Sequence, residues 1–566
     1  MRAPLPRTTF ARLIALLVGL ALVAAACGGD NGGDGATPEQ PDEPTPTEEG
    51  EPVVGGTLVD LQNFSAGNPE HIDPGLSAVL QGAQVTQLVF DGLTENDYET
   101  GELRPMVAES WESNDEGDEW TFTIREGVTF HNGDPVLPSD FKFAWERVVD
   151  PEFASELAYH LDPIVGSDAV AAGEATELEG VVADDEAMTL TVSLQFPYST
   201  FPVSVSHSVF SPVPREVVEA LDDQSQWERQ VMIGNGPFQM SEPWADDRYI
   251  RLERYDDYWG GLNGHAAYLD AVEFRISSDL DSAFQAFEAG QGDTGYIPPG
   301  RFEEVLARFP ENNATDETLG VYYFGFNMDD PVVGGEDNLA LRQAIALAID
   351  KQAIVDTVYG GSRTVATGWT PPGMPGYEEG SSEIAGAAER DLDRARELLE
   401  DWGGEVTEPI QLNFNAGAGH EPVAQIIQAN LEEIGIPSTL DGRDSTTYFS
   451  QMREGEGQFF RVGWIWDYVA YDNGLYPLFH TDSIGGDNLM QYSNPEVDEL
   501  IGEARATLDE DEANELYREA EEEILEDVAV VPLNWYTGSI VYDEAVRNFI
   551  QSPLQFVAYD EIWLDE

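Results

Sequence analysis

The chain is 566 residues long, with 42% hydrophobic and 10% aromatic residues, which corresponds to roughly four domains' length and is enough for packed cores. Asp and Glu number 108 against 27 Lys and Arg, so phosphate backbones would repel the chain and nucleic-acid binding is excluded. The single cysteine, Cys27, excludes a disulfide framework and CxxC-type metal sites. The lysines, Lys142 and Lys351, do not follow glycine, so the sequence has no GxxxxGK phosphate loop.

Residues 1–26 have the features of a secretory signal peptide. Arg2, Arg7 and Arg12 precede a short apolar run that ends in three alanines directly before Cys27. This ending resembles a bacterial lipoprotein cleavage site, which implies that Cys27 is the lipid-modified first residue of the mature protein. The alternative is an ordinary signal peptide followed by an incidental cysteine. Both interpretations predict export.

Residues 28–56 are rich in Gly, Asp, Glu, Pro and Thr and contain almost no apolar residues. Such a segment cannot bury enough surface to offset the entropy lost on ordering, so residues 27–56 are predicted to be a disordered, lipid-anchored tether. The acidic surplus should destabilise a compact state unless salt screens the repulsion. We therefore expect a source with an acidic proteome that lives in salty surroundings.

From Thr57 onward, short β-rich runs alternate with amphipathic helical patterns, which indicates an α/β fold without internal repeats. Apolar spacing predicts a helix over residues 340–358. A strand over 411–415, a helix over 422–434 and a strand over 436–440 predict a parallel βαβ unit.

The sequence contains no complete catalytic motif that we recognise. Serines that follow glycine lack the second glycine of GxSxG, and the seven histidines are too scattered for HExxH. Ser139 to Lys142 matches SxxK without its companion motifs, so Ser139 is interpreted as a helix N-cap. Paired acids are uninformative among 108 acidic residues. We expect no enzyme activity, metal or cofactor.

The segment from Gln87 to Pro151 carries the clearest family signature. It contains a Gly-Leu turn at 91–93, the sequence AESW at 108–111 and the sequence WTFTIREGVTFHNG at 120–133. The alternation of Trp120, Phe122 and Ile124 with polar residues predicts a strand with one buried face. The pattern resembles the bacterial extracellular solute-binding proteins of oligopeptide and dipeptide ABC transporters (family 5). We expect these signature residues to be scaffold and not ligand contacts.

Further matches to this family continue in order to the C-terminus: Ile233–Phe238, Tyr255–Gly260, Val272–Ile276, Tyr322–Asn327, Leu341–Asp350, Tyr492–Leu500 and Val530–Leu533. The resemblance implies a two-lobed α/β fold like that of periplasmic binding proteins, of the large cluster C type. The resemblance also implies an extra subdomain inserted in the first lobe and a hinged ligand cleft between the lobes. The expected divisions are a first lobe at 57–92, 231–322 and 531–566, an inserted subdomain at 93–230 and a second lobe at 323–530.

The sequence RVGWIWDY, from Arg461 to Tyr468, resembles a stretch in the cleft of peptide-binding members, where the aspartate receives the peptide's N-terminal ammonium. The resemblance implies this role for Asp467, which would form a charge-assisted hydrogen bond. It also implies that the main chain of Gly463 and Ile465 is a strand edge on which the peptide adds as a further strand.

The other candidate site residues are less sharply defined. The resemblance makes Arg461 a candidate for the peptide's carboxylate end and Leu80 a candidate for a facing backbone contact. Trp464, Trp466, Tyr468 and Tyr471 could wall the pocket or fill a core. Asp467 itself could instead cap a turn.

The resemblance therefore implies a substrate-binding protein, lipid-anchored to the outer face of the membrane, that closes over oligopeptides or dipeptides and delivers them to the permease and ATPase of an ABC importer. We expect a monomer. One alternative keeps the transport role with a non-peptide ligand such as a nickel chelate, an oligosaccharide, an opine or haem. A third hypothesis is an exported hydrolase.

Overall fold

The computed structural model describes residues 52–65, 67–221, 225–245, 248–260, 267–277, 279–416 and 419–565. The predicted signal peptide, the predicted lipidation site Cys27 and most of the predicted tether lie outside these residues. At the end of the predicted tether, Gly55 N–H donates to the Tyr268 carbonyl at 2.8 Å and Gly56 N–H to Asp270 at 3.1 Å. These bonds attach the chain directly before its first strand.

The first sheet has four strands in the order β1-β10-β9-β8: β1 (Thr57–Asp60), β10 (Ala271–Arg275), β9 (Tyr249–Arg254) and β8 (Phe238–Met240). β1 runs parallel to β10, and the other pairs are antiparallel. Ile250 and Leu252 are buried while their neighbours in β9 are half-buried, as expected for a sheet with one face on a core. Helix α1 (Leu80–Val89) contacts β8.

A second antiparallel sheet lies in the predicted inserted subdomain, in the order β4-β5-β7-β6: β4 (Ala108–Ser113), β5 (Glu119–Ile124), β7 (Thr189–Ser193) and β6 (Val181–Asp184). Trp120, Phe122 and Ile124 are buried in β5 while Thr121 and Thr123 are half-buried, so the predicted one-sided strand is confirmed.

Helix α2 (Pro138–Val149) contacts this sheet but begins earlier than predicted. Its N-cap is Leu137, whose N–H donates to Asp140 at 2.9 Å, and Ser139 lies inside the first turn. The prediction of Ser139 as N-cap is therefore wrong. The helix begins at Pro138, and proline is well suited to the first helical position because it lacks the N–H that would be unpaired there.

Shorter elements from the N-terminal and C-terminal parts of the chain accompany these two sheets. They are β2 (Thr94–Asn96), β3 (Leu103–Pro105), η1 (Ala158–Leu161), α3 (Ser167–Ala171), α4 (Phe201–Ser204), η2 (Ser208–Phe210), α5 (Arg215–Glu219), η3 (Trp227–Val231), α6 (Leu280–Glu288), β11 (Thr294–Tyr296), α7 (Phe302–Leu306), β12 (Asn313–Ala314), β19 (Ile540–Tyr542), β20 (Val546–Arg547) and β21 (Trp563–Leu564).

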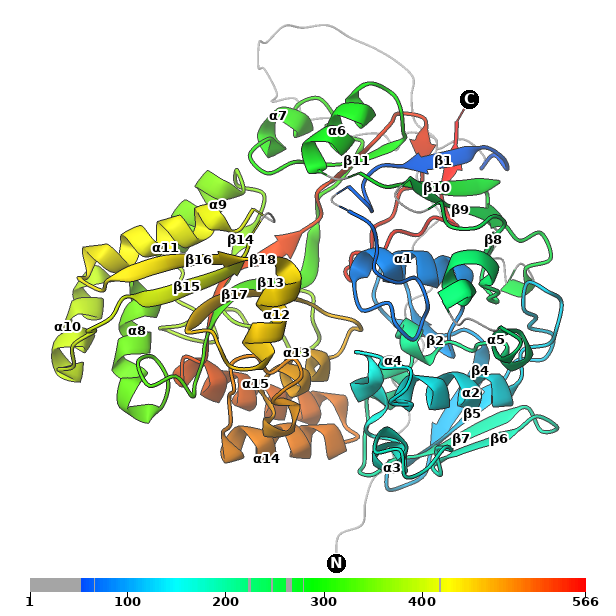
Figure 1. Cartoon of the computed structure of the whole chain (residues 1–566), viewed down its shortest axis with the longest axis horizontal. Helices are drawn as coiled ribbons and strands as arrows, with labels where there is room; N and C mark the ends of the chain where they lie inside the picture. The colour runs from blue at the N-terminus through cyan, green and yellow to red at the C-terminus, as the bar shows by residue number, and fades with distance from the viewer. Residues whose placement is uncertain are drawn as a thin grey trace, which may run out of the picture. The chain divides into compact units, whose positions relative to one another are not determined.

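The third large sheet has six strands in the order β14-β18-β13-β17-β15-β16 (Figure 1). Its strands are β14 (Thr364–Val365), β18 (Val530–Thr537), β13 (Glu317–Phe326), β17 (Phe459–Ile465), β15 (Ile410–Asn415) and β16 (Ser438–Arg443). The surrounding helices are α8 (Leu339–Ala348), α9 (Lys351–Val358), α10 (Leu392–Trp402), α11 (Glu421–Glu433), α12 (Ser445–Arg453), α13 (Tyr471–Phe479), α14 (Pro495–Ala506) and α15 (Glu510–Glu526), with the single turns η5 (Glu336–Asn338) and η6 (Thr481–Ser483).

The predicted βαβ unit is confirmed, because β15 and β16 pair in parallel with α11 between them in the chain. The helix predicted over residues 340–358 instead forms two helices, α8 and α9. Asp350 caps α9 by accepting a hydrogen bond from Ala353 N–H at 2.9 Å, and its own N–H donates to Asn430 of α11 at 3.0 Å. Apolar periodicity could not reveal this break because a distant side chain holds it.

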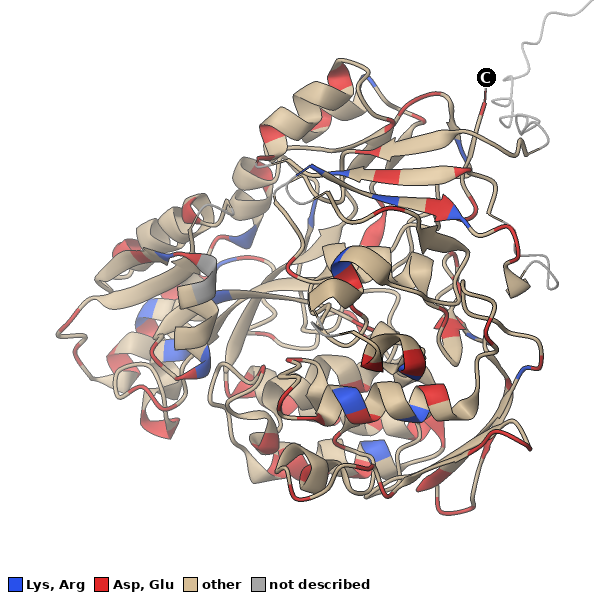
Figure 2. Ribbon diagram, turned by 45° about the vertical axis from the view of Figure 1, so that its right-hand side comes forward, with Lys and Arg blue, Asp and Glu red and all other residues tan. Residues whose placement is uncertain are grey.

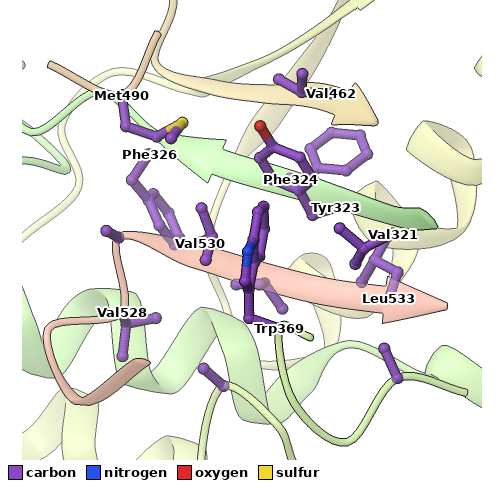
Figure 3. Close-up of a cluster of buried hydrophobic side chains, with 14 of the residues drawn as sticks. Val321, Tyr323, Phe324, Phe326, Trp369, Val462, Met490, Val528, Val530 and Leu533 are labelled. Atoms are coloured by element: carbon purple, nitrogen blue, oxygen red, sulfur yellow. The ribbon is translucent and has the colours of Figure 1, made fainter. Parts of the chain in front are cut away.

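Two large apolar cores accompany these sheets. One gathers around the six-stranded sheet, and the other is shared by the first sheet and the inserted sheet. Acidic residues are spread over the elements around both cores, with few basic residues among them (Figure 2). Figure 3 shows part of the core around the six-stranded sheet, where Val321 and Tyr323 of β13 lie near Val530 and Leu533 of β18, with Trp369 beside them. The predicted two-lobed α/β fold is confirmed.

Two chain segments connect the lobes. The chain leaves the three-stranded sheet β11-β19-β12 between β12 and β13 and returns to it between β18 and β19. The segments lie side by side, since Gly538 N–H donates to the Asp316 carbonyl at 2.9 Å. The predicted boundaries at 322/323 and 530/531 fall within β13 and β18. The division into lobes stays a prediction, and from sheet membership we propose to place it at 315–316 and 538–539.

Candidate functional site

Strand β17 carries most of the predicted site residues and lies between β13 and β15. It pairs with β13 along its length, from Phe459 opposite Phe326 to Ile465 opposite Gly320. It pairs with β15 only at Phe459 and Phe460. Among the described residues, the second half of β17 therefore has no strand partner on its β15 side.

The backbone groups of Gly463 and Ile465 face this unpaired side. Trp466 N–H donates to the Leu319 carbonyl of β13 at 3.0 Å, so the main chain of Trp466 faces β13. Successive residues of an antiparallel pair alternate in direction, so those of Gly463 and Ile465 face away from β13. They form no hydrogen bond on that side with the described part of the chain. An extended ligand can add there as a strand.

Gly463 is needed because two side chains approach it closely. A Cβ at this position would lie 2.2 Å from the hydroxyl oxygen of Tyr536 and 3.1 Å from a guanidinium nitrogen of Arg461. The first distance is far below van der Waals contact, so any larger residue would displace Tyr536. The glycine in this motif therefore keeps Tyr536 and Arg461 beside the strand.

Asp467 follows the end of β17. Its Oδ2 accepts a hydrogen bond from Asn473 Nδ2 at 3.0 Å, and its backbone N–H donates to Asn473 Oδ1 at 2.8 Å. Among the described residues, no backbone N–H donates to its carboxylate, as a turn cap would require. Burial raises the pKa of Asp467 to about 6. A partly dehydrated carboxylate with one neutral partner is well suited to a cation.

Asp467 lines a cavity of about 60 Å³ whose other lining residues come from the predicted first lobe and its predicted inserted subdomain. One part of the wall is the chain segment directly after α1, which includes Asp91. Another part includes Ser208 of η2. The C-terminal segment from Ser552 to Phe556 contributes a third part. Asp91 belongs to the signature segment, which is predicted from the sequence to be scaffold and not a ligand contact.

At the other end of the strand, Arg461 lies among polar and aromatic groups. Its guanidinium donates to Asn415 Oδ1 at 3.3 Å and to the Tyr536 hydroxyl at 3.2 Å. It lies 4.7 Å from the ring centroid of Tyr322, within cation–π range. It forms no ion pair with a carboxylate in the described ranges.

A second arginine joins this cluster. The Arg363 guanidinium lies 3.9 Å from the ring centroid of Tyr359 and 4.4 Å from that of Tyr536, and it donates to Asn534 at 3.0 Å. Arg363 also has no ion pair with the described carboxylates. Two guanidinium groups beside tyrosine hydroxyls form a site suited to a carboxylate.

His420 completes this end without adding charge. Its Nδ1 lies 3.1 Å from the hydroxyl of Tyr322. Burial, followed by the positive charges of Arg461 and Arg363, lowers its pKa to about 2. The imidazole is therefore neutral at physiological pH, and the two arginines supply the positive charge.

The predicted aromatic residues divide between site and core. Trp464 is half-buried, and its indole N–H has no partner among the described residues. Tyr468 is buried with its hydroxyl 3.4 Å from that of Tyr198. Trp466 is 1% exposed and Tyr471 is 3% exposed, and both belong to the core of the second lobe. Of the two alternatives predicted for Trp466 and Tyr471, the structure therefore favours filling a core.

Leu80 is the first residue of α1, and its side chain packs against the core of the second lobe. It thus lies where the two lobes meet. Its contact with a ligand backbone stays a prediction.

Several residues of the site carried no sequence signal. Arg363, Tyr536 and Asn415 lie far from Arg461 in sequence, and only the sheet brings them together. Ser208 lay in a segment without a motif. Pairing across the sheet decides these neighbours, and a single sequence does not show that pairing.

The residues that the structure describes contain no group of three or more His, Cys, Asp or Glu arranged to hold a metal ion. Within the same residues, no helix has the length and apolar character needed to cross a membrane.

Comparison with known proteins gives a consistent result. The family model for bacterial extracellular solute-binding proteins, family 5 (middle region), matches residues 102–486, more than half of the chain. The oligopeptide-binding protein OppA of Bacillus subtilis is 28% identical over 552 residues, which cover 95% of this chain and 96% of that protein. The dipeptide-binding protein DppE of Bacillus subtilis is 27% identical, with 88% and 90% covered.

Among solved structures, Haemophilus influenzae OppA in complex with the peptide RPPGFSPFR is similar, with a TM-score of 0.76 at 25% identity. The similarity covers 91% of this chain and all of that one. The sequence motifs, the two-lobed fold and these comparisons agree, and members of this family are solute-binding proteins and not enzymes. The chain belongs to the bacterial extracellular solute-binding proteins of family 5.

Proposed function

We propose that this protein is the substrate-binding component of an ABC importer and that it binds oligopeptides along strand β17. The observation that carries this proposal is the charge arrangement on one strand. A carboxylate, Asp467, follows one end, the guanidinium of Arg461 lies toward the other, and the backbone of Gly463 and Ile465 is unpaired between them among the described residues. A zwitterionic peptide has the complementary arrangement.

The spacing favours peptides of more than two residues. Arg461 and Asp467 are six positions apart, which corresponds to about 20 Å along an extended strand. An antiparallel ligand of about five or six residues spans this distance, with its ammonium at Asp467 and its carboxylate near Arg461 and Arg363. The relatives named for oligopeptide and dipeptide binding support the same ligand class.

The proposed function includes attachment of the protein to the outer face of the membrane. A signal peptide at 1–26 and lipid attached to Cys27 would hold the binding lobes at the outer face of the membrane, close to the permease. We expect the protein to act there as a monomer, to close over the peptide and to transfer it to the permease and its ATPase.

Calorimetry with one pentapeptide in three forms tests the ligand class. The free peptide should bind tightly, and N-acetylation or C-amidation should each weaken binding at least tenfold, because each modification removes one terminal charge. Equal affinity for all three forms would overturn the proposal and favour a non-peptide ligand. Mass spectrometry of ligands that copurify with the protein gives an independent identification.

A further inference from the structure

The cavity beside Asp467 is lined by carboxyl groups and by buried oxygen atoms that have no donor among the described residues. We propose that it takes a cationic side chain, that of lysine or arginine, from the first or second residue of the bound peptide. This inference rests on the proposed function, because it places the peptide's N-terminus at Asp467.

Four carboxylates line the cavity: Asp91, Glu95, Asp97 and Asp467. Arg104 pairs with two of them, at 3.1 Å from Glu95 and at 3.2 Å from Asp97. Burial raises the pKa of Asp91 well above its usual range. A cationic group of the ligand beside Asp91 would favour the charged form of this carboxyl.

The general acidic surplus of the chain does not explain this cluster. Surplus acidic residues face solvent, where water stabilises their charge, whereas Asp91 is only 7% exposed. Its Oδ2 accepts hydrogen bonds from the Tyr258 hydroxyl at 3.0 Å and from Trp259 Nε1 at 2.9 Å. Both donors are on one oxygen, and Oδ1 has no donor among the described residues.

Two neutral groups on the cavity wall also lack partners. Ser208 is 6% exposed, and its Oγ forms no hydrogen bond with the described residues. Asn96 donates through Nδ2 to Ser206 at 2.8 Å, whereas its Oδ1 is buried without a donor there. Buried polar atoms are normally hydrogen-bonded, so these oxygens indicate a ligand that donates.

A lysine or arginine side chain meets these requirements. Each is a pure donor, with three N–H groups for lysine and five for arginine. A cavity of about 60 Å³ has room for about four water molecules, which is close to the outer part of a lysine side chain. The apolar part of such a side chain can lie against Phe90, Met106 and Leu554, which also line the cavity.

The test uses pentapeptides that differ only in lysine or norleucine at position 1 or position 2. Norleucine keeps the aliphatic chain and removes the charge. We expect the lysine peptide to bind at least tenfold more tightly at one of the two positions. Equal affinity of lysine and norleucine peptides at both positions would overturn the inference.

Variants of the protein provide the second measurement. Glu95→Gln should lower the ratio of lysine to norleucine affinity at least threefold, whereas Glu99→Gln should leave this ratio unchanged. Glu95 lies in strand β2, and Glu99 is an exposed residue of the turn that follows this strand and does not line the cavity. A ratio that Glu95→Gln does not change would also overturn the inference.

The peptide comparison separates this inference from the proposed function. If the free pentapeptide binds better than its acetylated form while lysine and norleucine peptides bind equally, peptide binding stands and the cationic pocket fails. If acetylation has no effect, the proposed function itself fails.

Discussion

The two ends of strand β17 differ sharply in charge. At one end, Asp467 and other acidic residues line the same cavity. At the other end, Arg461 and Arg363 lie together without an ion pair to a described carboxylate. The chain has four times as many acidic as basic residues, so composition favours an acid near every arginine. The exception shows that local charge at a binding site follows tertiary contacts and not the average of the sequence.

The largest expected effect comes from removing the charge at the acidic end. Asp467→Asn should weaken the binding of a free pentapeptide by about 3 kcal/mol, roughly a hundredfold, because the peptide's ammonium loses its ionic partner. Calorimetry measures the change. The exposed Asp337 of the second lobe provides a matched control, Asp337→Asn, which should bind as the wild type does.

An acetylated peptide sharpens this result. It should bind the wild type and Asp467→Asn equally weakly, because neither complex contains the ammonium–carboxylate pair. If Asp467→Asn keeps full affinity for the free peptide, Asp467 does not hold the N-terminus.

At the basic end, Arg461→Met should cost about 2 kcal/mol, roughly thirtyfold in affinity. The loss is smaller than at Asp467 because Arg363 remains near the peptide's carboxylate. Titration with a C-amidated peptide should show little difference between this variant and the wild type. Arg394→Met, at an exposed position on α10, serves as the control.

The pH dependence of binding should separate the two ends. The pKa of Asp467 is raised to about 6, so the carboxylate becomes protonated as pH falls below 6 and can no longer pair with an ammonium. Affinity for the free peptide should therefore fall by up to about tenfold per pH unit below pH 6. It should also fall above about pH 8, where the peptide's α-amino group loses its proton.

Titrations between pH 4 and pH 9 measure this profile. Asp467→Asn should flatten its acidic limb, and Arg461→Met should leave the shape unchanged. An acidic limb that survives in Asp467→Asn would assign the titration to another group, such as the carboxyl of Asp487, whose pKa burial also raises to about 6.

The smallest effect on binding is expected from salt. Raising NaCl from 0.1 to 1 M shortens the Debye length from about 10 to about 3 Å, which screens exposed charges far more than buried ones. Peptide affinity should change less than about threefold, whereas the melting temperature should rise as repulsion between surface acids weakens. Calorimetric melts test this, and a flat or falling melting temperature would contradict the expected adaptation to salt.

Sequence reasoning worked best where a property is local. The buried alternation of Trp120, Phe122 and Ile124 predicted β5, and the βαβ unit around α11 followed from strand and helix periods. It failed where a distant group decides the local structure, as at Asp350, where Asn430 helps to divide one predicted helix into two.

The candidate site shows the same division. The motif from Arg461 to Tyr468 pointed to the strand and to Asp467, but not to Arg363, Tyr536 or Ser208. These side chains come from other strands and from the inserted region, and they reach the site only through sheet pairing and lobe contact.

The sequence by itself determined the family, the α/β character and the strand that carries the candidate site, because motifs and hydrophobic periods are properties of neighbouring residues. Tertiary structure alone decided which edge of β17 is unpaired, which arginines gather at its basic end and which carboxylates surround the cavity. The physical reason is that charge complementarity acts over a few ångströms in space. Residues that lie so near to one another can be separated by a hundred positions in the chain.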